Sequence, residues 1–192
     1  MSEPARGAIQ PLGADEVRVY TLASGESAIA RDATRSILAA LLGIAIPAVD
    51  IFDAPKGKPL LRNDSSLHFS ISHSRDVSMI AVTRVAAVGV DIERLRAVPN
   101  ADVILRRFFT HERINEILSD DNRDLRFVEA WTRAEATVKV RGASIWEAAT
   151  PDPSTTVRQI SAPEGFSAAV AVADTAWTVV QQDLPLAGLL TP

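Results

Sequence analysis

The pentapeptide Gly89-Val90-Asp91-Ile92-Glu93 decides how this chain is interpreted, read together with Trp131-Thr132-Arg133-Ala134-Glu135-Ala136-Thr137-Val138-Lys139. The first piece continues an apolar, β-branched run and predicts a strand. Residues i and i+2 share one face of a strand, so Asp91 and Glu93 point the same way while Ile92 points into the core. The second piece has no Gly or Pro and predicts a helix, on which Glu135 and Lys139 share a face with Trp131.

Together these pieces predict a site for phosphate and a metal ion. Three carboxylates, from Asp91, Glu93 and Glu135, supply the all-oxygen ligands that a hard cation such as Mg²⁺ prefers. Lys139, one helical turn beyond Glu135, would meet the remaining phosphate charge. Each motif alone is weak evidence, because carboxylates at a strand end are more often only solvated.

The composition narrows the class of protein. At 192 residues the chain can bury one sizeable core or two small subdomains in contact, and 47% hydrophobic and 23% charged residues are ordinary for a globular protein. The net charge of −4 argues against a nucleic-acid binder. The lack of cysteine excludes thiolate metal sites and cysteine nucleophiles, and it fits a reducing cytosol. Residues 1–13 lack the apolar core of a signal peptide, and no apolar run is long enough to span a membrane. We therefore expect a cytoplasmic protein without membrane or nucleic-acid partners.

Basic residues that could bind an anion occur at several places before the pentapeptide. A helix is predicted over Glu26–Leu42, where Arg31 and Arg35 lie four residues apart. Such a pair is more often a solvated basic edge than a phosphate clamp, and both interpretations stay open. Lys58 lies in a turn rich in Pro and Gly. His73 ends a predicted strand; a single histidine is more often structural, but its flanking hydroxyls favour anion binding.

The pattern of elements predicts an α+β fold made of two similar α/β subdomains. A strand–turn–strand unit at Phe69–Val82 has a counterpart at Phe166–Val180, and each follows a long helix. We expect the subdomains 1–87 and 88–192 to pack about a pseudo-two-fold axis, with a ligand between them. The other predicted strands and helices are Val17–Leu22, Val49–Phe52, Leu67–Ser72, Val77–Thr83, Asp102–Leu118, Leu125–Val140, Val157–Ile160, Phe166–Ala173 and Ala176–Gln181, with a Pro-rich connection at Ala149–Thr155.

The order and spacing of five motifs resembles the 4′-phosphopantetheinyl transferases of the surfactin-synthetase-activating (Sfp) type. The resemblance implies a pseudo-dimeric fold with coenzyme A in the cleft. It also implies Mg²⁺-dependent transfer, with Mn²⁺ as an alternative, of the phosphopantetheine arm of coenzyme A to a serine of an apo acyl or peptidyl carrier protein, releasing 3′,5′-adenosine bisphosphate. The motifs are Gly57-Lys58-Pro59, Phe69-Ser70-Ile71-Ser72-His73-Ser74, Gly89-Val90-Asp91-Ile92-Glu93, Arg107-Phe108-Phe109-Thr110 and the nonapeptide ending at Lys139.

At the reacting end of coenzyme A, the resemblance implies that Asp91, Glu93 and Glu135 bind the metal. Lys139 would contact the pyrophosphate. Breaking a phosphoanhydride needs its charge neutralised, which Mg²⁺ and Lys139 would supply. Glu135 is also the candidate base for the carrier serine, directly or through water.

At the nucleotide end, the resemblance implies that Ser72 and His73 contact phosphates, with His73 at the 3′-phosphate. Lys58 corresponds to the lysine beside the same phosphate. Arg35 and Arg31 correspond to basic positions on the first helix that hold the nucleotide.

The chain departs from the family pattern at Ala134, where lysine is common, and Arg133 is the nearest cation that could replace it. A basic stretch usual before the first helix is also missing. Two alternatives to a transferase are a non-catalytic carrier- or nucleotide-binding relative and a Mg²⁺-dependent hydrolase of nucleotide anhydrides. Because one chain holds both halves, we expect a monomer.

An acidic carrier would need basic or apolar groups on this acidic chain. The predicted helix Asp102–Leu118 offers Arg106 and Arg113. Phe108 and Phe109 are adjacent and point about 100° apart on a helix, so both cannot lie in one core face. One buried and one at the docking surface, or both buried between subdomains, are equally compatible with the sequence.

Overall fold

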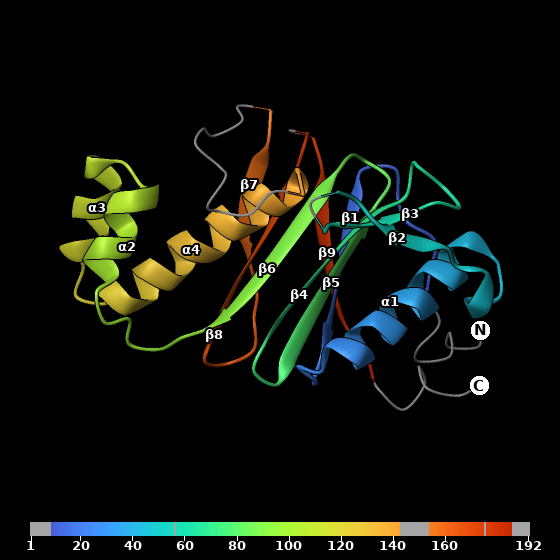
Figure 1. The fold of residues 1–192 in the computed structure, drawn as a ribbon, viewed down its shortest axis with the longest axis horizontal. Helices are drawn as coiled ribbons and strands as arrows, with labels where there is room; N and C mark the ends of the chain where they lie inside the picture. The colour runs from blue at the N-terminus through green and yellow to red at the C-terminus, as the bar shows by residue number, and fades with distance from the viewer. Residues whose placement is uncertain (1–8, 56, 143–153, 175, 186–192) are drawn as a thin grey trace, which may run out of the picture.

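Two β-sheets packed face to face, with one long helix on each outer side, make up the computed structural model (Figure 1). It describes residues 9–55, 57–142, 154–174 and 176–185. Within these residues no helix is long and apolar enough to cross a membrane. The elements are β1 (Glu16–Leu22), α1 (Ser27–Leu42), the 3₁₀ helix η1 (Ile46–Ala48), β2 (Ile51–Asp53), β3 (Pro59–Leu61), β4 (His68–Ser74), β5 (Val77–Thr83), β6 (Val88–Arg94), α2 (Ala101–Phe108), α3 (His111–Leu118), α4 (Arg123–Val140), β7 (Thr156–Ile160), β8 (Phe166–Val172) and β9 (Thr178–Asp183).

The first sheet has the strand order β4-β5-β1-β9, and α1 covers its outer face. Alternation along the strands separates the two faces: Tyr20 and Ile80 pack against Ile37 of α1. Val19 and Met79 point to the opposite face. Gly43, at φ 66°, ends α1 in the left-handed conformation that favours glycine.

The second sheet has the order β6-β8-β7 and packs its inner face against the first. Val90, Ile92 and Val170 belong to this shared core. On the outer face lies α4, and Gly89 allows its close approach, since a Cβ there would lie 2.0 Å from the carbonyl oxygen of Ala136. The tight packing places the side chains of α4 next to the outward face of β6.

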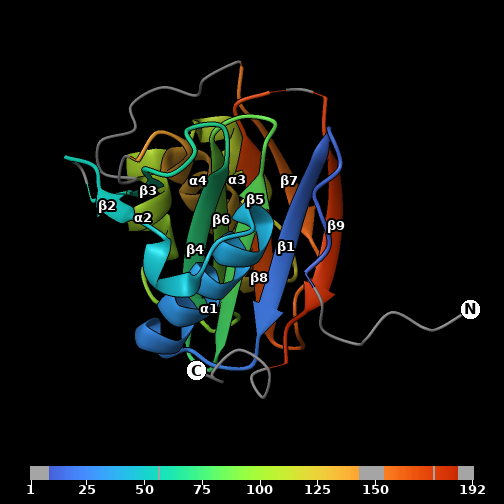
Figure 2. The same cartoon turned by 90° about the vertical axis from the view of Figure 1, so that its right-hand side faces the viewer.

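Strand β9 is reached from the second sheet but belongs to the first, where it pairs in parallel with β1 (Figure 2). The chain therefore crosses back between the sheets near its C-terminus. An α+β fold is confirmed, while the division into 1–87 and 88–192 stays a prediction. β9 from the second part completes the sheet of the first.

Two expectations on the elements were wrong. The helix predicted over Asp102–Leu118 is two helices, α2 and α3, because Thr110 interrupts it and its side chain accepts a hydrogen bond from the backbone N–H of Arg113, capping α3. The sequence reading also missed β3, which pairs with β2 as a short hairpin. Most of the predicted connection at 149–155, and most of the N-terminal arm, lie outside the described residues.

Candidate functional site

The candidate site lies where the free edge of β6 meets the inner face of β4, a place we call the serine junction. The serine side chains of β4, rather than its backbone, satisfy the amides of β6. Alternate residues of a strand share a face, so every second residue of β4 presents a hydroxyl here. The bonds run from Val90 N to Ser70 Oγ (3.1 Å), from Ile92 N to Ser72 Oγ (3.4 Å) and from Arg94 N to Ser74 Oγ (3.1 Å).

Asp91 is the buried carboxylate of this junction. Its Oδ1 accepts hydrogen bonds from Ser72 Oγ at 2.8 Å and from Lys139 Nζ at 2.7 Å. Its Oδ2 is buried and has no hydrogen-bond partner among the described residues. Burial raises the pKa of Asp91 in spite of the opposing effect of Lys139. The carboxylate is thus only half satisfied by protein groups.

Glu93 and Glu135 add negative charge beside Asp91. Glu93 accepts a hydrogen bond from Ser74 Oγ at 3.1 Å. Burial and the like charge of Asp91 raise the pKa of Glu93. Burial, then the charges of Asp91 and Glu93, raise the pKa of Glu135 against the effect of Lys139. The structure therefore brings together the three predicted acids, Lys139 and Ser72.

This donor set fits a hard divalent cation. Within the described part of the chain no group of three His, Asp or Glu side chains is already arranged as a metal site. The buried Asp91 Oδ2 nevertheless lacks a partner among the described residues, and the three crowded carboxylates are opposed by Lys139 and, at Glu93, by Arg96. Because their folded-state pKa values are raised, these acids stabilise the fold below their ordinary pKa and lose that contribution as pH rises through the raised values. A bound cation would offset this cost, and Asp91, Glu93 and Glu135 are the residues that would hold it.

His73 lies on the opposite face of β4 from Ser72. It is exposed, and its Nε2 is 3.4 Å from Ser27 Oγ, at the first residue of α1. Arg31, one turn further along α1, is exposed, whereas Arg35 donates from Nη1 to the backbone oxygen of Val49 at 2.6 Å. Ser72 and His73, predicted as a pair of phosphate ligands, therefore lie on opposite faces of β4.

Lys58, directly before β3, ties the β2–β3 hairpin to the start of β6 and to the end of α4. Its Nζ donates to the carbonyl oxygens of Val88 (3.0 Å), Lys139 (2.7 Å) and Val140 (2.8 Å), so all three of its donors are used. A cation favours the carbonyl end of a helix. Burial lowers the pKa of Lys58 to about 8. Its predicted place at the 3′-phosphate stays a prediction, because these contacts show it engaged with backbone oxygens.

Two hollows flank Lys58. The larger, about 610 Å³, is mostly apolar and lies between the β2–β3 hairpin and the end of α4, with Phe52, Phe69 and Arg141 in its wall. The smaller, about 240 Å³, reaches Lys139. Asp91, Glu93 and Glu135 line neither of them.

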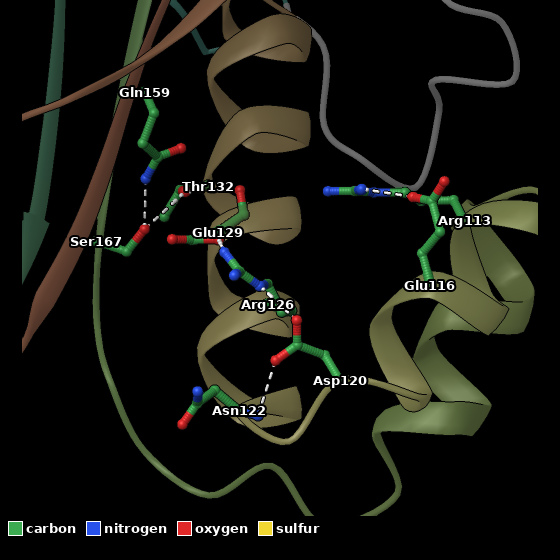
Figure 3. Close-up of polar contacts among 9 residues, drawn as sticks. All are labelled: Arg113, Glu116, Asp120, Asn122, Arg126, Glu129, Thr132, Gln159 and Ser167. Atoms are coloured by element: carbon green, nitrogen blue, oxygen red, sulfur yellow. Dashed lines mark hydrogen bonds and ion pairs between the residues drawn. The ribbon is translucent and has the colours of Figure 1, made fainter.

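A second polar region includes an ion pair within α3 and a set of contacts that runs from α4 through Ser167 of β8 to Gln159 of β7 (Figure 3). Arg113 pairs with Glu116 at 2.7 Å, and Arg126 pairs with Glu129 at 3.0 Å. Arg133 lines a hollow of about 400 Å³ with Arg113, Glu129 and Gln159, and burial and then Arg113 lower its pKa. Its guanidinium therefore lies among residues of α3, α4 and β7, and its replacement of a lysine at Ala134 stays a prediction.

The two phenylalanines of the predicted docking surface, Phe108 and Phe109, are both half-buried. Phe108 packs edge-on against Trp131, with ring centres 5.8 Å apart. The sequence was compatible with one buried and one surface ring, or with two buried rings. Neither describes the structure, because both residues are half-buried.

Sequence reasoning missed Ser74 as a partner of Glu93. The signal was present, because serines at positions 70, 72 and 74 recur with the period of a strand face. The serine pattern does not indicate which strand faces these serines.

Comparison with known proteins bears on the whole arrangement. The sequence model of the 4′-phosphopantetheinyl transferase superfamily matches residues 87–182. The chain is 32% identical over 120 residues to the 4′-phosphopantetheinyl transferase HetI of Nostoc sp. (strain PCC 7120), covering 60% of this chain and 51% of the relative. It is 36% identical over 91 residues to 4′-phosphopantetheinyl transferase psf-1 of Bacillus pumilus (46% and 38%). It is 31% identical over 109 residues to 4′-phosphopantetheinyl transferase AcpT of Escherichia coli K12 (55% and 55%).

The match spans about half the length of these relatives or less. The region matched by the family model includes β6 and α4, which carry Asp91, Glu93, Glu135 and Lys139. The family model covers half of the chain, and the chain belongs to the 4′-phosphopantetheinyl transferase superfamily.

Proposed function

We propose that this protein transfers the 4′-phosphopantetheine arm of coenzyme A to a serine of an apo carrier protein. The observation that supports it most is the half-satisfied Asp91, held between Ser72 and Lys139 beside two further acids. In the reaction the serine oxygen bonds to the phosphorus that carries pantetheine. The anhydride bond of that phosphorus to the adenosine side breaks, and 3′,5′-adenosine bisphosphate leaves with the electron pair.

The residues at the serine junction would divide this work. Mg²⁺ bound by Asp91, Glu93 and Glu135 would neutralise charge on the pyrophosphate. Lys139 Nζ, 2.7 Å from Asp91 Oδ1, would orient that carboxylate. It also donates to Ser72 Oγ and Val90 O, and one of these two bonds would give way to a phosphate oxygen when the substrate binds. Glu135 takes the proton of the serine, a role that suits a carboxylate whose pKa is raised.

The nucleotide would lie between the two α/β halves, which we propose form a pseudo-dimer. His73 is exposed and lies 3.4 Å from Ser27 at the start of α1, and Arg31 is exposed one turn further along that helix, which supports His73 at the 3′-phosphate and Arg31 at the nucleotide end. Ser72 serves the reacting end through Asp91 and Lys139. Arg35 and Lys58 bind backbone oxygens and would act on the nucleotide by shaping its surroundings.

The partner in this proposal is an acyl or peptidyl carrier protein, bound by a monomer in the cytoplasm. Carriers of this kind are expected to be acidic around the modified serine. Arg106 is exposed on α2 and Arg113 is half-buried on α3, and together with the half-buried Phe108 and Phe109 they form the proposed docking surface.

The test is to mix the protein with coenzyme A, Mg²⁺ and a panel of apo carriers and to weigh the carriers by mass spectrometry. We expect at least one carrier to gain the mass of one phosphopantetheine group, and its serine-to-alanine variant to gain none. Adenosine bisphosphate without carrier modification would indicate an anhydride hydrolase. Binding of carrier or coenzyme A without any product would indicate a non-catalytic relative.

A further inference from the structure

The three serines of β4 all accept a hydrogen bond from a backbone amide of β6, but they differ in whether they also donate one to a carboxylate. Ser70, Ser72 and Ser74 each accept a hydrogen bond from a backbone amide on the free edge of β6. The free amides of an edge strand are normally protected, by another strand or by a covering segment. Here the side-chain oxygens of the serines accept their hydrogen bonds. The three residues therefore share a role in joining the sheets.

Only two of the three also hold a carboxylate. Ser72 donates to Asp91 Oδ1 at 2.8 Å, and Ser74 donates to Glu93 Oε2 at 3.1 Å. A hydroxyl has one proton and two acceptor sites, so donating to Glu93 while accepting from Arg94 N fixes its rotor. Ser70 accepts from Val90 N, and no carboxylate of the described residues bonds to it.

We propose that Ser74 is a positioning residue, which holds the Glu93 carboxylate towards Asp91 and Glu135 for metal binding. This inference rests on the proposed function, because it assumes that these acids bind a divalent cation. Nothing in the chain's membership of its superfamily assigns a role to this serine.

The physical reason is that the charges of Glu93, Asp91 and Glu135 repel one another. Asp91 and Glu93 lie two residues apart on the same face of β6. Without a donor, repulsion would turn the flexible Glu93 side chain towards solvent, and a cation would have to bring it back. A hydroxyl fixed to the backbone of β6 opposes this movement before the cation arrives. Groups that orient metal ligands in this way typically change metal affinity by about 10- to 100-fold when removed.

The experiment compares Ser74→Ala with its matched control Ser70→Ala. Mn²⁺ is titrated into each protein and free Mn²⁺ is followed by electron paramagnetic resonance, with and without coenzyme A. We expect Ser74→Ala to weaken Mn²⁺ binding about 10-fold. Ser70→Ala should lower the denaturation midpoint to a similar extent, through loss of the same kind of amide bond, and leave the Mn²⁺ dissociation constant within about twofold of wild type.

Two further measurements separate positioning from a general loss of structure. Ser74→Thr keeps a hydroxyl on a strand, where a β-branched residue is accepted, and should restore Mn²⁺ binding. In the metal-free proteins, the ¹³C carboxyl resonance of Glu93 should move in Ser74→Ala and stay in Ser70→Ala.

Equal weakening of Mn²⁺ binding by Ser74→Ala and Ser70→Ala would overturn the inference and leave the proposed function standing. So would wild-type affinity in Ser74→Ala with an unchanged Glu93 resonance. A wild-type protein that bound no Mn²⁺ even with coenzyme A would overturn the metal assignment, and the positioning role with it.

Discussion

Two of the places where strands from the early and late parts of the chain meet are built differently. β9 joins β1 through a regular parallel ladder that runs from Glu16 opposite Thr178 to Thr21 opposite Asp183. At the serine junction, β6 meets β4 through hydroxyl groups, and Lys58 and Lys139 donate to the carbonyls of Val88 and Val90 on the same edge. The contact between β1 and β9 uses backbone groups of both strands. The contact between β4 and β6 uses the serine side chains of β4.

The difference explains where chemistry can take place. A backbone ladder consumes its own polar groups and leaves the side chains to other tasks: those of β1 alternate between two apolar cores, and those of β9 are mostly exposed. The serine junction instead brings hydroxyl and ammonium groups to the level of Asp91, a buried carboxylate that they satisfy only in part. The ladder supplies stability alone, whereas the serine junction also holds polar groups in position for a ligand.

The largest effect is expected when the acids of the serine junction are removed. Asp91→Asn and Glu135→Gln should each lower the rate of carrier modification at least about 1000-fold, because several kcal/mol of charge neutralisation are lost. Both variants should melt cooperatively, since neither change opens a cavity. Glu129→Gln, on the same helix but paired with Arg126 away from the junction, serves as control and should stay within a few-fold of wild type. Near-normal transfer by either junction variant would remove the acids from the mechanism.

A smaller and more selective effect is expected on the far face of β4. His73→Ala should weaken coenzyme A binding about 10-fold more than dephospho-coenzyme A binding, since a hydrogen bond to a charged group contributes about 1.5–3 kcal/mol. Isothermal titration with both ligands measures the difference. His68→Ala, on the other face of the same strand, should affect both ligands alike. Equal losses in His73→Ala would place the 3′-phosphate elsewhere.

Lys58→Met tests the bonds that tie the β2–β3 hairpin to β6 and to the end of α4. Three carbonyl oxygens would lose their donor, so the free energy of unfolding should fall by about 2 kcal/mol in urea denaturation. Unchanged stability would contradict the role of Lys58 at the junction. A loss of affinity for coenzyme A that spares dephospho-coenzyme A would add the predicted contact with the 3′-phosphate, and equal losses would leave the structural role alone.

The smallest effect is expected at the proposed docking surface, which includes neither the serine junction nor the β1–β9 ladder. Arg113, whose side chain is 42% exposed, pairs with Glu116 on its own helix, and such a pair is worth under about 1 kcal/mol. Arg113→Glu should raise the apparent KM for an acidic carrier about threefold at low salt and leave the KM for coenzyme A unchanged. The effect should shrink as salt screens the charges. Unchanged carrier kinetics at low salt would move the docking surface elsewhere.

Much of the local structure follows from short patterns in the sequence. The period of two in β6 correctly predicted that Asp91 and Glu93 share a face opposite Ile92, and the four-residue spacing on α4 aligned Glu135 with Lys139. Where a local side-chain bond competed with helix propensity, at Thr110, the prediction of one long helix was wrong.

What the sequence did not reveal depends on tertiary pairing. Nothing near Thr178 marks it as a parallel partner of Glu16. Ser74 and Lys58 acquire their roles only because the edge of β6 lies against β4. For His73 the strand period was itself informative, since adjacent residues face opposite sides, yet the family resemblance treated Ser72 and His73 as one pair of ligands.

The central claim is that the serine junction assembles a divalent-cation site from Asp91, Glu93 and Glu135. Anomalous X-ray scattering from crystals grown with Mn²⁺ and coenzyme A tests it most directly. We predict one strong peak enclosed by these three carboxylates, with a pyrophosphate oxygen completing the shell. With Mg²⁺ in its place, the bonds to oxygen should be about 2.0–2.1 Å long. A peak bound by other residues, or coenzyme A bound with no metal at the junction, would contradict the account.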